Sequence, residues 1–555
     1  MKINIKYSLL VCAFLLGSCE DDFLDRAPLD VITNETFWET EEHLVLAVNA
    51  IYGNIKEKNT VDMENMGDNT IWPSTTSYQL IGSGNFGNDL GTLNTEWGTQ
   101  YAAVRQANAF LENYDKADVP EARKEQLAAE VRVIRALAYS YLTNFWGDVP
   151  LVTTTLTVDE LYGPRNPREE VVDFLLEDLE LAAQHLPAEI PTGVDRGRMN
   201  KAAALGLKAR IALYNQRWEV AEQAAKAVMD MGIYELYSNG DPNTSYKELF
   251  TYAGNLSGGN NRETIIARLS LTGVTDHNLS REIQVPDQVV RWNPTKSLVD
   301  SYLMIDGLPI EKSPLYDVDT YEEVFENRDP RMTQTILEPG SPWGGRYDSS
   351  LRHSDNDASN DHPDTLWVPK FQSDRRGATT ITGYYFTKYV ELSTVPEVGR
   401  DVNDIILLRY AEILLTYAEA RYEQGELTQA DLDMTINLLR DRVGMKHMVL
   451  SELEANGLDV REEIHRERRV ELALEGQRYF DIIRWRKGEL LAQDVKGTNV
   501  NWLPEHLNLS ALRTDDEGFI IVSSGRTFDP GRNYLWPVPL PQVQRNPELG
   551  QNPGW

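Results

Sequence analysis

The stretch REEIHRERRVELALEGQRYFDIIRW, residues 461–485, combines many charges with apolar residues three or four positions apart. That spacing is typical of a helix with one buried face, and the face comprises Leu472, Gly476, Tyr479, Phe480 and Ile483. A glycine there predicts that a neighbouring helix approaches closely. Glu462 and Arg466 are spaced for an i,i+4 ion pair. We therefore interpret the stretch as a salt-bridged helix buried on one side; an anion site at its arginines is the alternative.

Helical periodicity continues on both sides of this stretch. It dominates residues 41–231 and 403–487, whereas residues 234–400 are rich in Gly, Pro, Asn, Asp and Ser and have no sustained period. The predicted fold class is therefore mostly α-helical, with long irregular loops and short strands. A long irregular stretch inside a compact protein usually carries function, so we expect the ligand-binding face there.

The helices come in pairs joined by short turns. ARIALYNQRWEVAEQAAKAVMD (209–230) predicts a turn at Gln216-Arg217, and residues 411–442 predict another at Gly425. Asn200 is a candidate N-cap for the first of these helices. The pairs look like tetratricopeptide units, but they do not repeat at 34 residues, so we expect an irregular helical scaffold.

We divide the chain into five segments. One compact unit is expected from about residue 30 to residue 555, and the residues before it form the signal peptide and the start of a tether. The tail should run extended because prolines occupy positions 537, 539, 541, 547 and 553, with Trp536 and Trp555 pinning it to the core. The segments are a signal peptide (1–18), a tether (19–40), an N-terminal helical part (41–233), an irregular ligand-face region (234–402) and a C-terminal helical part with the tail (403–555).

The N-terminus has the pattern of an export signal. Two lysines precede an apolar run, Leu9 to Leu16, that is far too short to span a bilayer. The run ends in LGSC at Cys19, which resembles a bacterial lipobox and predicts lipidation of Cys19; an ordinary signal peptide is the alternative. Cleavage there would remove Cys12, the only other cysteine, and leave no disulfide pair. The acids at 20–22 are either a solvated tether or a surface-export signal.

Composition and motifs argue against several functions. The net charge of -32 and the lack of a basic stripe disfavour nucleic-acid binding. GSGNFG (82–87) lacks the strand and helix of a nucleotide site, and the eight histidines are scattered. DNDASND (355–361) spaces oxygens like a calcium loop but lacks the glycine and the closing glutamate, so no cofactor is expected and calcium is only weakly supported. No carboxylate pair stands out for glycoside hydrolysis.

Five motifs follow one another along the chain: RVIRALAYSYLTNFWGDVPL (132–151), RMNKAAALGLKARIALY (198–214), LRYAEILLTYAEA (408–420), ERRVELALEGQRYFDIIRW (467–485) and LWPVPLPQVQRNPELGQNPGW (535–555). In this order they resemble the SusD/RagB family of outer-membrane nutrient-binding lipoproteins of Bacteroidetes. This resemblance implies a non-enzymatic protein that is lipid-anchored in the outer membrane and faces the cell exterior. It would capture oligosaccharides and deliver them to a SusC-like TonB-dependent transporter; a peptide-binding or protein-binding RagB-like nutrient receptor is the alternative.

Candidate ligand residues follow from the chemistry of sugars. A pyranose ring has an apolar C–H face that stacks on aromatic rings and hydroxyl edges that hydrogen-bond to amides and guanidinium groups. Aromatic residues outside the helical stripes and nearby polar residues are therefore the candidates, and Trp343, between Pro342 and two glycines, is expected to be an exposed platform. Local core packing is the alternative for each tryptophan. The full set is Trp343, Trp72, Trp292, Trp367, Tyr78, Asn69, Asn85 and Arg346.

Overall fold

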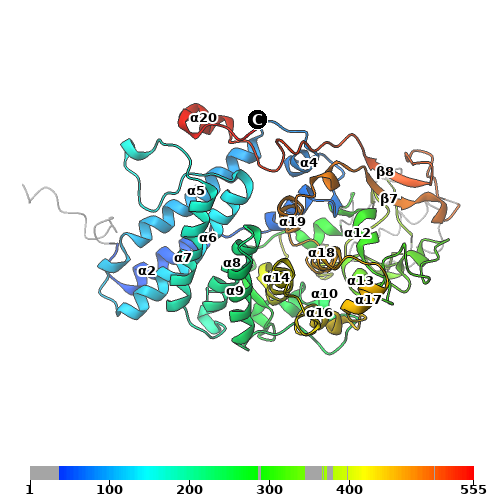
Figure 1. Ribbon diagram of the computed structural model, residues 1–555, viewed down its shortest axis with the longest axis horizontal. Helices are drawn as coiled ribbons and strands as arrows, with labels where there is room; N and C mark the ends of the chain where they lie inside the picture. The colour runs from blue at the N-terminus through cyan, green and yellow to red at the C-terminus, as the bar shows by residue number, and fades with distance from the viewer. Residues whose placement is uncertain are drawn as a thin grey trace, which may run out of the picture.

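A row of long helices builds the N-terminal half, and each helix packs against the next (Figure 1). The computed structural model describes residues 37–284, 289–343, 365–366, 368–371, 379–396, 398–505 and 507–555. No helix in these ranges is long and apolar enough to cross a membrane. The helices of the row are α2 (Glu41–Tyr52), α5 (Gly91–Leu111), α6 (Glu121–Trp146), α7 (Arg168–His185), α8 (Lys201–Tyr214) and α9 (Trp218–Asp230).

Local sequence signals set the ends of these helices, as predicted. The Asn200 side chain accepts a hydrogen bond from the backbone N–H of Ala203 and so caps α8. The predicted turn at Gln216-Arg217 separates α8 from α9. Helix α6 stops before Gly147, whose φ of 72° lies in the left-handed region. The sequence DVP that follows could not have continued the helix.

Helix α14 continues the row, because it packs against α9 on one side and α18 on the other. The turn predicted at Gly425 is present, with φ 74° at that glycine. This C-terminal group is mostly yellow to orange in Figure 1. Its helices are α14 (Tyr410–Glu423), α15 (Gln429–Asp433), α16 (Ile436–Val443), α17 (Leu450–Ala455), α18 (Val460–Glu471) and α19 (Arg478–Arg484).

The structure corrects the single helical face expected within residues 461–485. The chain leaves the helical path between α18 and α19, with positive φ at Leu474 (65°) and Gly476 (72°). A Cβ on Gly476 would lie 2.2 Å from the backbone oxygen of Thr60, so this glycine permits a close approach of a turn, not of a helix. The predicted Glu462–Arg466 pair is also wrong, since Arg466 pairs with Glu463 at 3.2 Å.

Two carboxylates of α18, Glu467 and Glu471, belong to a buried ionic network, which confirms the expected salt-bridged helix. Five cations and five carboxylates, each at most 8% exposed, are linked by contacts of 2.6 to 3.3 Å. Equal numbers of opposite charges satisfy one another where water is excluded. The buried ionic network consists of Glu263, Asp329, Arg331, Lys388, Arg409, Arg440, Arg442, Glu467, Glu471 and Glu475.

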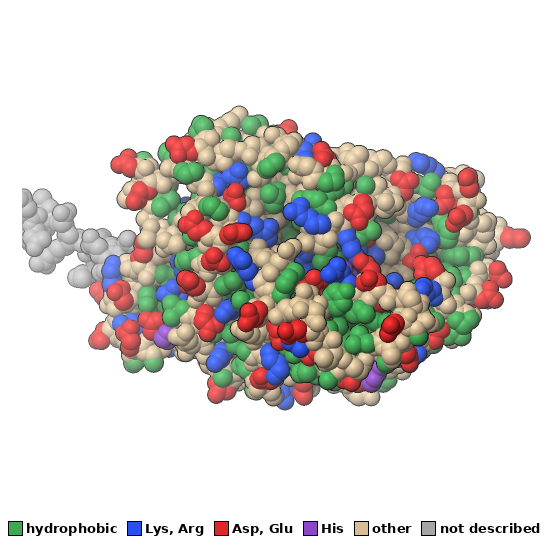
Figure 2. Space-filling view, viewed as in Figure 1, with side chains coloured by type: hydrophobic (Ala, Val, Ile, Leu, Met, Phe, Trp, Pro, Cys, Tyr) green, Lys and Arg blue, Asp and Glu red, His purple; other side chains and the backbone are tan. Residues whose placement is uncertain are grey.

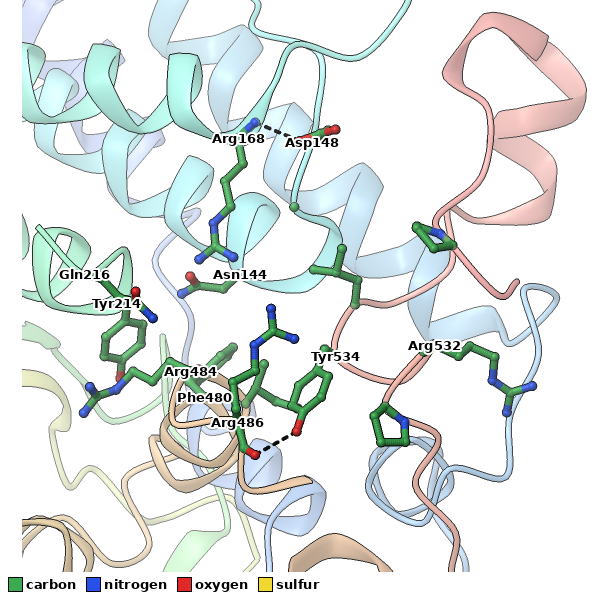
Figure 3. A pocket seen from close by; sticks show the side chains of 16 residues that line it. Asn144, Asp148, Arg168, Tyr214, Gln216, Phe480, Arg484, Arg486, Arg532 and Tyr534 are labelled. Atoms are coloured by element: carbon green, nitrogen blue, oxygen red, sulfur yellow. Dashed lines mark hydrogen bonds between the residues drawn. The ribbon is translucent and has the colours of Figure 1, made fainter. Parts of the chain in front are cut away.

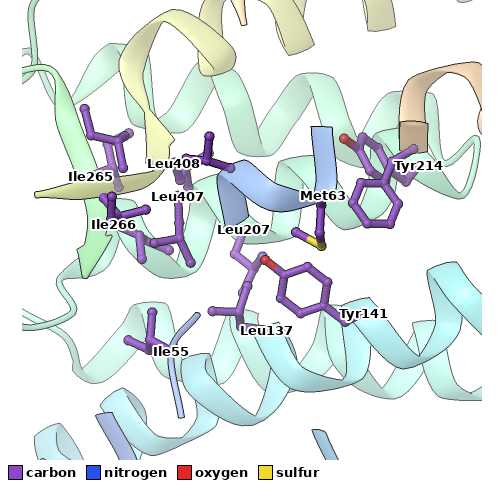
Figure 4. Close-up of a cluster of buried hydrophobic side chains, with 14 of the residues drawn as sticks. Ile55, Met63, Leu137, Tyr141, Leu207, Tyr214, Ile265, Ile266, Leu407 and Leu408 are labelled. Atoms are coloured by element: carbon purple, nitrogen blue, oxygen red, sulfur yellow. The ribbon is translucent and has the colours of Figure 1, made fainter. Parts of the chain in front are cut away.

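The irregular middle region is tied to the helices by short antiparallel ladders, each two-stranded within the described ranges. Strands β2 (Thr264–Arg268) and β6 (Ile405–Arg409) lie against α8, and their apolar side chains join those of α6 and α8 in one core (Figure 4). Gly206 makes room for this, because a Cβ there would meet Leu408 at 2.8 Å.

The remaining helices and strands are short, and they come from the N-terminal part, the middle region and the C-terminal part of the chain. Strand pairing joins β1 with β3, β4 with β5, and β7 with β8. These elements are α3 (Asn59–Asp62), α4 (Ser77–Gly82), α10 (Ser245–Glu248), α11 (Leu279–Ile283), α12 (Lys296–Ser301), α13 (Arg331–Thr335), β1 (Thr70–Ile71), β3 (Asn293–Pro294), β4 (Ser341–Pro342), β5 (Thr365–Leu366), β7 (Val495–Asn499) and β8 (Phe519–Ser523).

The C-terminal tail is pinned by its tryptophans, as predicted. Trp536 is 1% exposed and stacks on Phe145 with a centroid separation of 3.8 Å. The Trp555 indole N–H donates to the carbonyl of Leu535 at 2.9 Å. The tail is not wholly extended, however, because α20 (Leu540–Arg545) interrupts it. A proline in the first turn of a helix needs no N–H partner, so Pro541 is compatible with α20.

Candidate functional site

Strand pairing brings together two of the predicted aromatic residues. In the β1–β3 ladder Thr70 pairs with Pro294 and Ile71 with Asn293, and the same register places Trp72 opposite Trp292. The two indole rings lie edge to face, with centroids 4.9 Å apart and an interplanar angle of 83°. Such an arrangement is favourable for aromatic pairs. We call these two residues the tryptophan pair.

Neither indole N–H of the tryptophan pair has a hydrogen-bond partner among the described residues, although both nitrogens are buried. A buried polar group without a partner costs free energy. Trp292 is fully buried, whereas Trp72 is only partly buried and keeps some contact with solvent.

Three charged residues surround the tryptophan pair. The Lys58 ammonium lies 5.1 Å from the Trp292 ring centroid, and the Arg291 guanidinium lies 5.8 Å from that of Trp72. Glu282 forms ion pairs with both cations, at 2.9 Å to Lys58. The side chain of Arg291 is 45% exposed, so this guanidinium, which lies over the Trp72 ring, also presents donors to solvent.

A short capped helix holds the loop that carries Trp72. Thr76 and Gln79 form a reciprocal capping box at the start of α4. The Gln79 side chain also donates to the Trp72 carbonyl at 2.9 Å. The intervening residues Ser74 and Thr75 are exposed. The result is a partly exposed tryptophan with a guanidinium over its ring and two exposed hydroxyl residues nearby in the chain, a combination that suits a ligand with both apolar and polar faces.

The expectation of an exposed platform at Trp343 is wrong. Its side chain is 4% exposed and packs edge to face on Tyr385 at 5.4 Å. Val290, Leu337 and Leu366 complete a small apolar cluster around it. In the described conformation, neither Trp343 nor the fully buried Trp292 offers a free ring face.

The two asparagines predicted to bind ligand, Asn69 and Asn85, form hydrogen bonds to other groups of the protein. Asn69 is fully buried, where it donates to Glu64 at 2.7 Å and accepts from Arg469 at 2.8 Å. Its amide therefore links two parts of the protein and has no free polar edge. Asn85 is exposed, beyond the end of α4, and donates to Ser83 instead of contacting the tryptophan pair.

Tyr78 is half-buried on α4. Its hydroxyl donates to Glu96 at 2.8 Å. Burial, together with the negative charge of Glu96, raises the pKa of this phenol well above its usual value. The hydroxyl thus stays protonated and committed to Glu96.

Trp367, Arg346, Cys19 and the DNDASND loop (355–361) lie outside the described residues. Within the ranges that the structure describes, no group of three or more His, Cys, Asp or Glu side chains is placed to hold a metal ion.

Sequence reasoning missed Lys58, Glu282 and Arg291. Arg291 directly precedes Trp292, and this RW dipeptide was the available signal. No signal marked Lys58 or Glu282, because they reach the tryptophan pair from segments separated by more than 200 residues.

A mostly helical scaffold that carries an aromatic and polar surface cluster defines a class of binding protein, and comparison with known proteins identifies the family. The model described as "SusD family" matches residues 279–555, and the one described as "Starch-binding associating with outer membrane" matches residues 22–213. The chain belongs to the SusD/RagB family, which confirms the prediction from its motifs.

Full-length relatives and solved structures agree with this assignment. SusD-like protein P25 of Formosa agariphila is 24% identical and covers 99% of this chain and 98% of its own. The starch-binding protein SusD of Bacteroides thetaiotaomicron is 25% identical over 69% of this chain and 68% of its own. A SusD-like carbohydrate-binding protein of Bacteroides fragilis has a TM-score of 0.77 at 27% identity, covering 93% of this chain and all of that one. A laminarin-binding SusD-like protein, at 21% identity and a TM-score of 0.65, covers 93% of this chain and all of its own, and shows likeness of fold.

Proposed function

We propose that this protein captures oligosaccharides at the cell surface without chemically changing them. In this proposal a lipid on Cys19 anchors it to the outer membrane. The captured sugar passes to a SusC-like TonB-dependent transporter. The names of the relatives support the proposal, since they describe proteins that bind starch, laminarin or other carbohydrates.

The observation that carries the proposal is the tryptophan pair. Trp72 is partly exposed and packs edge to face on Trp292, Arg291 lies over its ring, and the exposed residues Ser74 and Thr75 follow it closely in the chain. A sugar can stack its C–H face on Trp72 while its hydroxyls bond to the polar groups. The tryptophan pair is thus the proposed centre of the sugar site. Trp343 and Trp367 lie in the same irregular region of the sequence as Trp292.

The expected affinity is modest. A few stacked rings and hydrogen bonds give about -4 to -8 kcal/mol, which corresponds to a Kd in the millimolar to micromolar range. Weak binding suits a protein that must release its cargo to a transporter.

Affinity electrophoresis against a panel of neutral glycans, followed by calorimetry on any glycan that retards the protein, tests the proposal. The variant W72A should weaken binding about tenfold, because the stacking face is lost. W502A is a matched control, since Trp502 is also partly buried and also lies edge to face on an aromatic ring, Phe519, at 5.4 Å. Equal affinity in W72A and W502A would refute the role of Trp72. Retention of peptides but of no glycan would favour the RagB-like alternative, and release of reducing ends would indicate an enzyme.

A further inference from the structure

A cavity whose lining does not include the tryptophan pair lies where the helical row meets the C-terminal group. Its volume is about 360 Å³, at the lower end of the range for cavities that hold small molecules. The ends of α6 and α8, the start of α7, the end of α19 and the segment around Tyr534 line it. Figure 2 shows that this face of the molecule is hollowed near its centre and that Lys and Arg side chains gather around the hollow.

Four arginines line the cavity, but two of them are engaged elsewhere. Arg484 forms ion pairs with Glu419 at 2.6 Å and with Asp481 at 2.8 Å. Arg532 lies over the Trp555 ring and points away from the cavity centre (Figure 3). Arg484 is therefore neutralised by carboxylates of the protein. The Arg532 guanidinium packs on Trp555 and donates to the Gly84 carbonyl at 3.3 Å instead of reaching into the cavity.

The other two guanidinium groups, of Arg168 and Arg486, point into the cavity from opposite sides (Figure 3). Within the described part of the chain neither of them forms an ion pair. Arg168 uses its Nε to donate to Asn215 at 2.7 Å, and Arg486 rests over the Tyr534 ring at 4.4 Å. Their terminal N–H groups remain available as donors.

Electrostatics favours an anion between these two side chains. Burial and the like charge of Arg486 lower the pKa of Arg168 to about 10, so it remains charged at neutral pH but lacks a counter-charge. The one carboxylate that lines the cavity, Asp148, accepts a hydrogen bond from the Arg168 backbone N–H and forms no ion pair with its guanidinium. In a chain with a net charge of -32, two facing and unpaired arginines are unexpected unless something compensates them.

The backbone conformation around this cavity also indicates a binding site. Arg486 and Gln216 are two of only five described residues other than glycine with positive φ, both at 58°, and both line this cavity. Each is the second residue past the end of a helix, α19 or α8, where glycine adopts this conformation at no steric cost. The chain instead carries long polar side chains there, and such conformations concentrate at binding sites.

We propose that Arg168 and Arg486 form a binding site for an anionic group, a carboxylate or a sulfate, carried by a sugar unit. Arginine is suited to both groups because its planar fork donates two parallel hydrogen bonds. The amides of Asn144 and Gln216 also line the cavity and can bond to sugar hydroxyls. The inference rests on the proposed function, since it assigns acidic sugars as a cargo class and adds a second contact site.

Calorimetry at about 150 mM salt tests the site, with glucuronate and glucose 6-sulfate against glucose and inorganic sulfate. The two acidic sugars should bind the wild-type protein at least tenfold more tightly than glucose, and R168Q/R486Q should abolish that preference. The variant K226Q/R513Q changes the charge equally at two residues outside the cavity and should keep it. Equal binding of glucose and glucuronate, or an unaffected double variant, would overturn the proposal. Binding of inorganic sulfate without the acidic sugars would overturn the assignment to a sugar.

The single variant R486G separates binding from folding. Glycine adopts a φ of 58° freely, so the thermal midpoint should not fall, while affinity for glucuronate should drop several-fold. A lower thermal midpoint with unchanged affinity would show a purely structural role for Arg486. Failure of every glycan, neutral or acidic, to bind the wild-type protein would contradict the proposed function as a whole, whereas loss of the acid preference alone contradicts only this site.

Discussion

Substitution of Glu471 by glutamine tests the buried ionic network that holds α18. Glu471 is fully buried and accepts hydrogen bonds from Arg442 at 2.6 Å, from Arg409 at 2.7 Å and from Arg331 at 3.0 Å. Burial alone would raise the pKa of this carboxyl, but the three arginines outweigh burial and hold the pKa well below its usual value. Glu471 is therefore ionised throughout the physiological range.

The E471Q variant keeps the shape of the side chain but leaves one excess cation in the buried ionic network. Each hydrogen bond to a charged group contributes about 1.5–3 kcal/mol, and the amide oxygen retains only part of the three. The amide N–H group would also face a guanidinium. Removal of one partner from a buried ionic group typically costs about 3–5 kcal/mol, and we expect a loss of that size here.

Urea unfolding at pH 7, followed by far-UV circular dichroism, measures this loss. The matched control is D230N, which neutralises one carboxylate of the exposed Lys226–Asp230 pair. An exposed pair of this kind contributes less than about 1 kcal/mol. If E471Q lost no more stability than D230N, the buried ionic network would not stabilise the fold in the way proposed.

Three further outcomes follow from the structure. Substitution of Gly476 by alanine places a Cβ 2.2 Å from the Thr60 oxygen at a φ of 72°, and should cost about 3 kcal/mol or more; an unchanged melting temperature would contradict this. Burial lowers the pKa of His465 to about 3, so below pH 6.5 the unfolded chain binds a proton that the folded chain does not. The free energy of unfolding should therefore fall by about 2 kcal/mol between pH 6.5 and 5, and H465Q should remove that slope. The N552A variant loses two buried hydrogen bonds to backbone carbonyls, one of them of Trp146 at 2.9 Å, and should unfold about 2–3 kcal/mol more easily with faster proteolysis of the tail; a tail cleaved no faster than in wild type would argue against that anchor.

Helix pairs and their turns were predictable from the sequence because their signals are local. Amphipathic period, the Asn200 cap and the turn at Gln216-Arg217 each depend on neighbouring residues alone. The break between α18 and α19 was not predictable, because the apolar period runs through it. That break depends on Thr60, more than 400 residues away, whose backbone leaves room only for glycine at position 476.

The sequence indicated which residue types form the candidate site, but it did not indicate how exposed each side chain is. Trp72 and Trp292 were chosen as aromatic residues in polar loops, and the structure places them side by side. Their unequal burial depends on pairing between β1 and β3, which lie about 220 residues apart. Trp343 was expected to be open because of its flanking Pro and Gly, but a cluster that includes Tyr385 encloses it.

Capture of sugar, as proposed, depends on contact between the partly exposed Trp72 and a sugar ring. Fluorine NMR on protein labelled with 5-fluorotryptophan measures this directly, with the Trp72 resonance assigned from its disappearance in W72F. On titration with a glycan that retards the protein in electrophoresis, the Trp72 resonance should shift, while that of Trp146, fully buried in the helical core, should not. A bound glycan that leaves the Trp72 resonance in place would contradict a sugar site at Trp72.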